Sequence, residues 1–335
     1  MKKYTFLIVV LIFVFGCSSK TECQKPVGPY LGQVPPAGSE DKLFAPGIVS
    51  NGMDNRDVTM MPNGKEIYFC ASFGNFNYSA IMFCHQNSDG TWTNPEIAPF
   101  SRNPEYMDFE PCISPDGKHL YFLSNRPDFD AGDTVKGDQD IWVVDRIGDG
   151  WGEPYNLGEP INSTDEEYYP SVTKEGTIYF TRQEKGSPIG FIYRSQLIDG
   201  KYQEPEKLPE QVNCGSSQFN AFISPDEDFI IVPVAGMETT LGGVDYYITF
   251  RNNADQWSEP QNMGKPVNSE NAREWSASLS ADGKYLFFMS GRSTEKPKDL
   301  TYGEFIKIFD SSDNGSSNVY WISAELIEKL RPEGF

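Results

Sequence analysis

Residues 113–126 read ISPDGKHLYFLSNR, and this stretch decides the fold. A Pro-Asp-Gly-Lys turn precedes a run of aromatic and aliphatic residues, which predicts a tight turn that leads into a buried β-strand. Four further segments share the pattern: MMPNGKEIYFCAS from Met60, VTKEGTIYFTR from Val172, ISPDEDFIIVPV from Ile223 and LSADGKYLFFMSGR from Leu279. The corresponding turn residues are spaced by 53, 59, 51 and 56 positions: Gly64, Gly117, Gly176, Glu227 and Gly283. Repeats of this length and pattern are typical of four-stranded propeller blades.

The remaining strands of each repeat follow in a constant order. A third strand is expected at AIMFC (from Ala80), DIWVVD (Asp140), GFIYRS (Gly190), DYYITF (Asp245) and NVYWIS (Asn318). A fourth strand follows in the first four repeats only, whereas KLFAPGIVS, from Lys42, resembles the NLGEPINS half of such a strand. The sequence therefore predicts an all-β protein: a single five-bladed β-propeller of four-stranded blades, closed by an N-terminal strand that completes the last blade.

The N-terminus predicts export and an anchor. Two lysines precede a largely apolar run from Tyr4 to Gly16, too short to span a bilayer but typical of a secretory signal. Val14-Phe15-Gly16-Cys17 resembles a bacterial lipobox, which implies cleavage before Cys17 and lipidation of its thiol. The alternative is a plain signal peptide with an incidental cysteine. We therefore expect a signal peptide at 1–16, a lipidated tether at 17–42, and a propeller at 43–335 with a short C-terminal helix over 324–331.

Composition narrows the partners. A formal net charge of −20 argues against nucleic acid as a partner. No apolar run after Cys17 approaches 18 residues, so the membrane is expected to be contacted through the lipid anchor only. Two histidines leave little room for histidine-based metal or catalytic centres. Cys70 and Cys84 are expected on neighbouring strands, where they either form a disulfide or serve as small buried side chains.

One end of the ring is predicted to carry function. The Asp-Gly turns are short and lie at one end, whereas the opposite end carries the crossovers between blades and two long insertions, Asn125–Gln139 and Ser293–Ser317. Binding residues tend to lie on such loops over a rigid scaffold. We therefore expect the ligand at the loop-rich end.

Three columns of residues at the start of each innermost strand are the candidate ligand-binding residues. The first column is Asn55, Asp108, Glu167, Gln218 and Glu274. The second is Arg56, Phe109, Tyr168, Phe219 and Trp275. The third is Asp57, Glu110, Tyr169, Asn220 and Ser276. Trp275, beside Arg273 and Glu274, offers the largest aromatic face. Aromatic faces among hydrogen-bond acceptors suit sugars. The structural alternative is that the carboxylates cap crossover amides and the aromatic rings fill gaps between blades.

Two classes of function follow from these columns. The leading hypothesis is a non-enzymatic protein that binds a glycan, a peptide or an envelope protein at the loop-rich end. The alternative is a glycan-degrading hydrolase or lyase, whose catalytic carboxylates would come from Asp57, Asp108, Glu110, Glu167 and Glu274. Such a pair must lie about 5–5.5 Å or 6.5–9.5 Å apart.

No cofactor is expected from the motifs of the chain. A calcium site is a weaker prediction in the acidic loop that carries Asp128, Asp130 and Asp133, whose spacing differs from that of an EF-hand. A solvated acidic loop is the alternative.

The repeat motif SPDGK-[HY]-L-[YF]-F, followed by G-x-x-D-[IY]-[WY], resembles the WD40-like Pro-Asp repeats of TolB-like propellers. The overall layout is similar to that of short propeller lipoproteins of Bacteroidetes-type bacteria. This resemblance implies a protein partner and an envelope location, at the outer membrane facing the periplasm or at the cell surface. Glu227 departs from the family's turn glycine.

Overall fold

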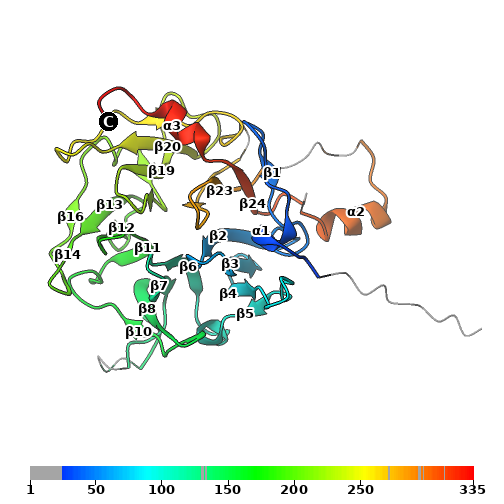
Figure 1. Ribbon diagram of the computed structural model, residues 1–335, viewed down its shortest axis with the longest axis horizontal. Helices are drawn as coiled ribbons and strands as arrows, with labels where there is room; N and C mark the ends of the chain where they lie inside the picture. The colour runs from blue at the N-terminus through cyan, green and yellow to red at the C-terminus, as the bar shows by residue number, and fades with distance from the viewer. Residues whose placement is uncertain are drawn as a thin grey trace, which may run out of the picture.

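Five antiparallel sheets surround a common centre (Figure 1). The computed structural model describes residues 25–129, 132, 134–270, 272–292, 296, 298–312 and 314–335. Each sheet is one blade, and the blades follow one another along the chain. The predicted all-β five-bladed propeller is therefore confirmed.

The blades share one strand order, from the innermost strand outward. Blade 1 contains β2 (Asp54–Met60), β3 (Glu66–Phe73), β4 (Tyr78–His85) and β5 (Glu96–Ile97). Blade 2 contains β6 (Asp108–Ile113), β7 (His119–Ser124), β8 (Asp140–Ile147) and β10 (Tyr155–Asn156), with β9 (Gly150–Trp151) also paired to β8. Blade 3 contains β11 (Glu166–Val172), β12 (Ile178–Gln183), β13 (Gly190–Ser195) and β16 (Glu206–Lys207). The β14–β15 hairpin (Leu197–Ile198 and Lys201–Tyr202) precedes β16.

In blade 4 the innermost strand is divided into two short pieces. Blade 4 contains β17 (Ser217–Gln218), β18 (Phe222–Ile223), β19 (Phe229–Ala235), β20 (Asp245–Phe250) and β21 (Gln261–Asn262). Blade 5 contains β22 (Ala277–Leu279), β23 (Tyr285–Ser290), β24 (Asn318–Ser323) and β1 (Lys42–Leu43).

The N-terminal strand closes the ring, as predicted. β1 pairs with β24 in antiparallel register, with Lys42 opposite Trp321 and Leu43 opposite Tyr320. Figure 1 shows β1 beside β24, although they lie near opposite ends of the chain. Phe44, which follows β1, packs on Phe287 and Trp321 with ring centroids 4.7 and 5.1 Å apart. The innermost and outermost strands of blade 5 therefore come from different ends of the sequence.

One hydrogen bond recurs in every blade and explains why KLFAPGIVS resembles NLGEPINS. After each fourth strand, a serine or asparagine side chain accepts a hydrogen bond from the backbone N–H of the second, third or fourth residue of the third strand. These acceptors are Ser50, Ser101, Asn162, Asn213 and Asn268. In blade 5, Ser50 Oγ accepts from Val319 N at 3.1 Å and donates to Val319 O at 3.0 Å. The N-terminal segment thus repeats the role of the other crossovers.

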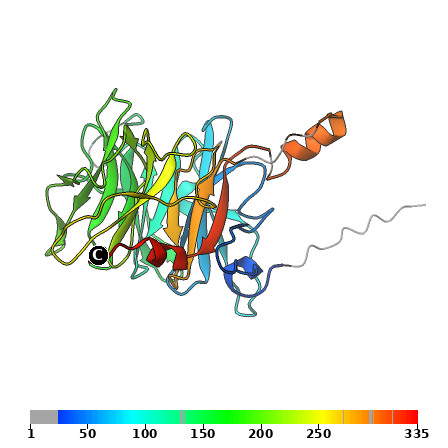
Figure 2. The same ribbon diagram turned by 90° about the horizontal axis from the view of Figure 1, so that it is seen from above.

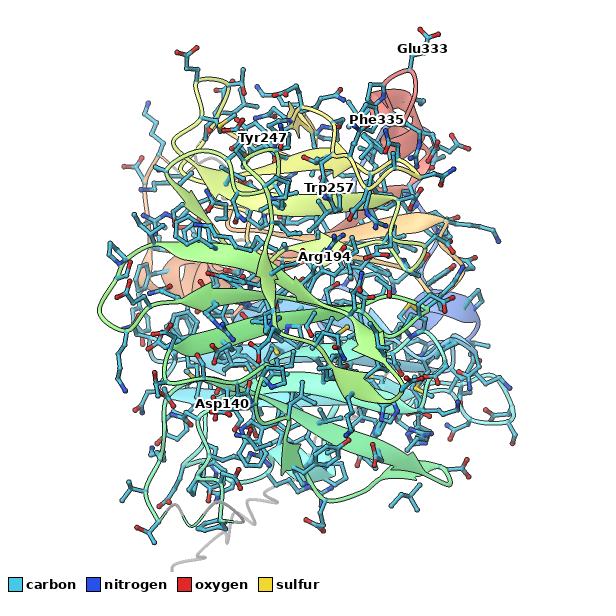
Figure 3. All side chains as sticks on the ribbon, turned by 90° about the vertical axis from the view of Figure 1, so that its left-hand side faces the viewer. Asp140, Arg194, Tyr247, Trp257, Glu333 and Phe335 are labelled. Carbon is cyan, nitrogen blue, oxygen red and sulfur yellow. The ribbon has the colours of Figure 1, made fainter. Side chains whose placement is uncertain are left out.

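The blades are joined by apolar cores and by ion pairs on the outer side of the ring. Figure 3 shows that side, with Arg194 of blade 3 below Trp257 of blade 4. Arg194 donates to both carboxylate oxygens of Asp255, at 2.9 and 2.6 Å, across this junction. Cys70 and Cys84 are both free and buried in different core clusters, on opposite faces of β3 and β4. The disulfide alternative is therefore wrong, and both cysteines serve as small core residues.

The described part of the segment predicted to be a tether is packed against the propeller. From Pro26 onward the chain packs against blades 1 and 5. Val27 forms a bridge with Thr91, and the ring of Tyr30 lies 5.3 Å from that of Tyr285. Leu31, in α1 (Pro29–Gly32), is fully buried. Sequence composition gave no sign of this packing, because the segment contacts the ring through only a few apolar side chains.

Helices occupy little of the chain. A short 3-10 helix, η1 (Pro99–Ser101), precedes blade 2, and α3 (Glu325–Leu330) confirms the expected C-terminal helix. The insertion between β23 and β24 contains α2 (Tyr302–Phe309), which projects outward from the ring (Figure 2). Asn314 Nδ2 donates to Gly52 O at 2.8 Å and to Phe309 O at 3.0 Å, which fixes the end of α2 to blade 1. Among the described residues, no helix is long and apolar enough to cross a membrane.

Candidate functional site

The third column gathers on the propeller axis because three innermost strands carry a bulge. The register shifts between Arg56 and Thr59 in blade 1, and β6 and β11 shift at the equivalent positions. Asp57, Glu110 and Tyr169 adopt left-handed backbone with φ of 58°, 59° and 53°. Non-glycine residues rarely adopt this conformation, and such strain concentrates at functional sites. The bulges turn these residues away from the regular strand alternation.

The third column and Arg56 form a hydrogen-bonded set, here called the central belt: Arg56, Asp57, Glu110, Tyr169, Asn220 and Ser276. Its contacts join blades that are not neighbours in the ring. Asn220 Nδ2 of blade 4 donates to Glu110 Oε1 of blade 2 at 2.9 Å. Tyr169 Oη of blade 3 donates to Ala277 O of blade 5 at 2.8 Å. Only side chains that reach the axis can make such contacts, so the belt spans the centre of the ring.

Arg56 balances the two belt carboxylates. Its Nε lies 2.7 Å from Asp57 Oδ2, and its Nη2 lies 2.6 Å from Glu110 Oε1. Ser276 Oγ donates to Asp57 Oδ1, and Tyr169 N donates to Glu110 Oε2 at 2.8 Å. Burial raises the pKa of Glu110, and the Arg56 guanidinium opposes this effect. All four carboxylate oxygens therefore have a donor within the protein.

The first column points into the blades. Asn55, Asp108, Glu167, Gln218 and Glu274 are all at most 1% exposed. Glu167 Oε1 accepts from Ser163 Oγ at 2.6 Å and from Arg182 Nε at 2.6 Å. Glu274 Oε1 accepts from Ser269 Oγ at 2.8 Å and from Ser290 Oγ at 3.0 Å, and burial raises its pKa to about 7. Such bonds to nearby loops are what the structural alternative predicts. Ligand contact by this column stays a prediction.

Asp108 belongs to the same pattern. Its Oδ1 accepts from Arg126 Nη2 at 2.8 Å, and Arg126 also donates to Phe100 O of the preceding crossover. Arginine recurs at the end of the second strand in three blades, as Arg126, Arg182 and Arg292. Each donates to carbonyl oxygens of the preceding crossover. This role was not expected from the sequence, although three of the quoted repeats end in arginine.

The second column divides into three environments. Arg56 belongs to the central belt. Phe109 is buried, and its ring packs edge to face with that of Phe76, with ring centroids 5.6 Å apart. Tyr168 is half-buried, and its hydroxyl donates to Gln183 Oε1 at 3.2 Å. Phe219 and Trp275 meet edge to face with ring centroids 4.7 Å apart. The aromatic side chains of this column therefore lie in different environments.

Trp275 borders an open pocket at the loop-rich end, here called the Trp275 pocket. The pocket has a volume of ≈ 510 Å³ and is lined by Gly243, Ala272, Arg273, Trp275, Gly291 and Ser317. Two of these residues flank the insertion that contains α2. The side chain of Arg273 is exposed at the rim. A half-buried indole beside an exposed guanidinium is thus presented to solvent.

A further cavity lies beside α2, and another lies at the centre of the ring. A groove of ≈ 720 Å³ separates α2 from blade 1 and is bordered by Met53, Phe73, Phe305 and Phe309. A smaller cavity of ≈ 190 Å³ is lined by innermost strands of all five blades, including Cys112, Ser171 and Phe222. Asp57 and Tyr169 of the central belt also line this cavity.

The calcium prediction lies largely outside the described part of the chain. Asp130 and Asp133 are outside the described residues, whereas Asp128 is described. Among the described residues, no group of three or more histidine, cysteine, aspartate or glutamate side chains could hold a metal ion. The calcium site stays a prediction. Cys17, the predicted lipidation site, also lies outside the described residues.

Comparisons with known proteins add only a likeness of fold. No family model matches the sequence, and no curated protein matches it. The structure is similar to the catalytic domain of a GH62 α-L-arabinofuranosidase from Coprinopsis cinerea, with 9% identity, a TM-score of 0.45, and coverage of 81% of this chain and 90% of that chain. A Hadza microbial sialidase is similar over 82% of this chain and 52% of its own, with 10% identity and a TM-score of 0.43.

A puromycin-hydrolyzing peptidase from Mycobacterium tuberculosis is similar over 73% of this chain, with 10% identity and a TM-score of 0.42. The match covers only 35% of that peptidase. Such low identities concern the fold alone.

Proposed function

We propose that this chain is a lipid-anchored envelope protein that binds a saccharide at the loop-rich end of its propeller without chemical turnover. The observation that carries the proposal is the Trp275 pocket, where an indole held edge to face by Phe219 borders an open cavity. The aromatic contact fixes the orientation of the indole before a ligand arrives, which lowers the entropic cost of binding.

A saccharide suits this pocket better than a purely apolar ligand. The C–H faces of a sugar ring stack on an aromatic face, whereas its hydroxyls need hydrogen-bond partners. The pocket is lined by glycines, Arg273 and Ser317 beside the indole. Glycines leave backbone groups accessible, so polar and aromatic contacts are available within one cavity.

The occupied carboxylates favour binding over hydrolysis. Hydrolysis requires a carboxyl group that can reach a proton of the substrate or of an attacking water. The oxygens of Asp57 and Glu110 are already bonded to belt residues. Glu274 is fully buried within its blade. A hydrolase or lyase would therefore need these groups to rearrange before reaction, and it is the second hypothesis for that reason.

The binding test uses the Cys17→Ser form, which lacks the predicted lipid, in titrations against a panel of oligosaccharides. We expect Trp275→Ala to weaken binding about tenfold, because an aromatic hot-spot residue contributes on the order of 1–2 kcal/mol. Lys118→Ala, at the Asp-Gly turns, is the control and should leave affinity unchanged. Loss of affinity in the Lys118 variant but not in the Trp275 variant would place the ligand at the other end.

Turnover is measured on the same panel by the appearance of new reducing ends. The binding proposal predicts none. Sustained cleavage that Glu110→Gln or Glu274→Gln abolishes would favour the hydrolase or lyase instead, because an amide cannot act as a general acid or base.

A further inference from the structure

We infer that the saccharide is acidic and that Arg273 pairs with its carboxylate. This inference rests on the proposed saccharide-binding function and adds the chemical class of the ligand. It begins from an unpaired cation in a strongly acidic protein, whose formal net charge is −20.

The backbone of Arg273 is held between blades 4 and 5. Arg273 forms a parallel bridge with Val244, and its carbonyl oxygen accepts from Gly291 N at 3.3 Å. The backbone N–H of the next residue, Glu274, donates to Val244 O at 3.1 Å. The guanidinium therefore extends from a fixed point on the rim of the Trp275 pocket.

A glycine accommodates the side chain. A Cβ atom at Gly243 would lie 3.3 Å from Cγ of Arg273 and 3.5 Å from its Nε. The stem of Arg273 thus passes close over the backbone of Gly243, where a larger residue would displace it. This contact directs the guanidinium along the pocket wall that Gly243 forms.

Within the described part of the chain, the side chain of Arg273 has no hydrogen bond or ion pair. The nearby carboxylates are bonded to other groups. Glu274 is bonded to two serines, and Glu270 is 2.6 Å from Lys265. Asp245 accepts from the backbone N–H groups of Leu241 and Gly242, at 2.7 and 3.1 Å. No described neighbour in sequence therefore neutralises the guanidinium.

Of the described arginines, Arg102 and Arg273 have no side-chain hydrogen bond or ion pair, and only Arg273 borders the Trp275 pocket. Arg56, Arg126, Arg182 and Arg292 each lie within 2.8 Å of a carboxylate oxygen. A planar guanidinium can bind a carboxylate through two parallel hydrogen bonds. The N–H groups of the Arg273 guanidinium are available to a ligand, and the Trp275 indole borders the same cavity. A sugar with a carboxylate substituent would bind the guanidinium through its carboxylate and stack its ring on the indole.

The test compares two forms of one polysaccharide. Galacturonate oligomers and their methyl esters share a sugar backbone but differ in charge. We expect the wild-type protein to bind the acid at least tenfold more tightly than the ester, with affinity that falls as sodium chloride is added. Arg273→Gln should remove that preference while retaining binding of the ester.

Lys118→Gln is the matched control, because it makes the same change in net charge at the opposite end of the ring. It should retain the preference for the acid. Thermal unfolding of each variant checks that the ring is intact.

The outcomes separate the two claims. If the ester or neutral oligosaccharides bind as tightly as the acid, or if Arg273→Gln retains the preference, the acidic class is wrong and saccharide binding stands. If neither acidic nor neutral saccharides bind, both claims are wrong. If poly-glutamate binds with the same dependence on Arg273 while the saccharides do not, the ligand is an acidic peptide and both claims are again wrong.

Discussion

At the scale of single residues, burial decides which polar side chains remain available to a ligand. Glu274 and Trp275 are adjacent in sequence, but the carboxylate lies inside the blade and the indole borders a pocket. Neighbouring residues of an extended chain point to opposite sides. One of the two therefore supports the blade, while the other faces the ligand space.

Glu274 should make stability depend on pH. Burial raises its pKa from 4.5 to about 7, so the folded protein retains a proton that the unfolded chain releases. The free energy of unfolding should therefore decrease as pH rises from about 4.5 to 7, by on the order of 3 kcal/mol. Glu274→Gln removes this charge and should raise the melting temperature at pH 8 more than at pH 5. Exposed Glu325→Gln is the control. An equal effect of Glu274→Gln at both pH values would contradict the prediction.

At the scale of elements, the sequence predicted the strands well because each blade repeats the same turn and the same apolar run. The fourth strand of blade 5 was also predictable, because KLFAPGIVS at 42–50 resembles NLGEPINS at 156–163 of blade 2. The bulges were not predictable. Asp57, Glu110 and Tyr169 adopt left-handed backbone without a glycine to indicate it. The sequence therefore located the central belt on the inner strands but could not show its bonds.

The closing strand provides an element-scale prediction. Ser50→Ala removes a buried bond to Val319 N and should lower the free energy of unfolding by about 1–3 kcal/mol. Ser88→Ala, at an exposed turn position, should have little effect. Chemical denaturation measures both.

Deleting 42–50 should destabilise the whole ring, since it leaves β24 without its outer partner. Near wild-type stability after this deletion would refute closure by β1.

At the scale of the whole molecule, the arrangement of the blades determines where the pocket lies. The Trp275 pocket lies where a loop insertion meets the gap between blades 4 and 5. Sequence columns identified Trp275, but they could not separate it from buried Phe109 because both follow the same repeat position. The difference arises from neighbouring loops, which do not repeat.

The proposed anchor makes a prediction about the entire chain. Cys17→Ser should move the protein from the membrane fraction to the soluble fraction, because lipid is the proposed means of attachment. Fractionation followed by immunoblotting measures the distribution. Trp275→Ala should remain with the membrane and serves as a control for folding and export. Retention of the Cys17 variant in the membrane fraction would contradict lipidation as the means of attachment.

The strand that closes the ring also sets an order of events during synthesis. Ser50 and Val319 are 269 positions apart, so the first strand to emerge waits for almost the entire chain before it finds its partner. Contacts between such distant residues slow folding, because a long loop must be closed before the contact forms. Until then, the nascent propeller is an open arc with unpaired edges that can associate with other chains. We therefore expect the open arc to be the stage of folding at which this protein is most prone to aggregate.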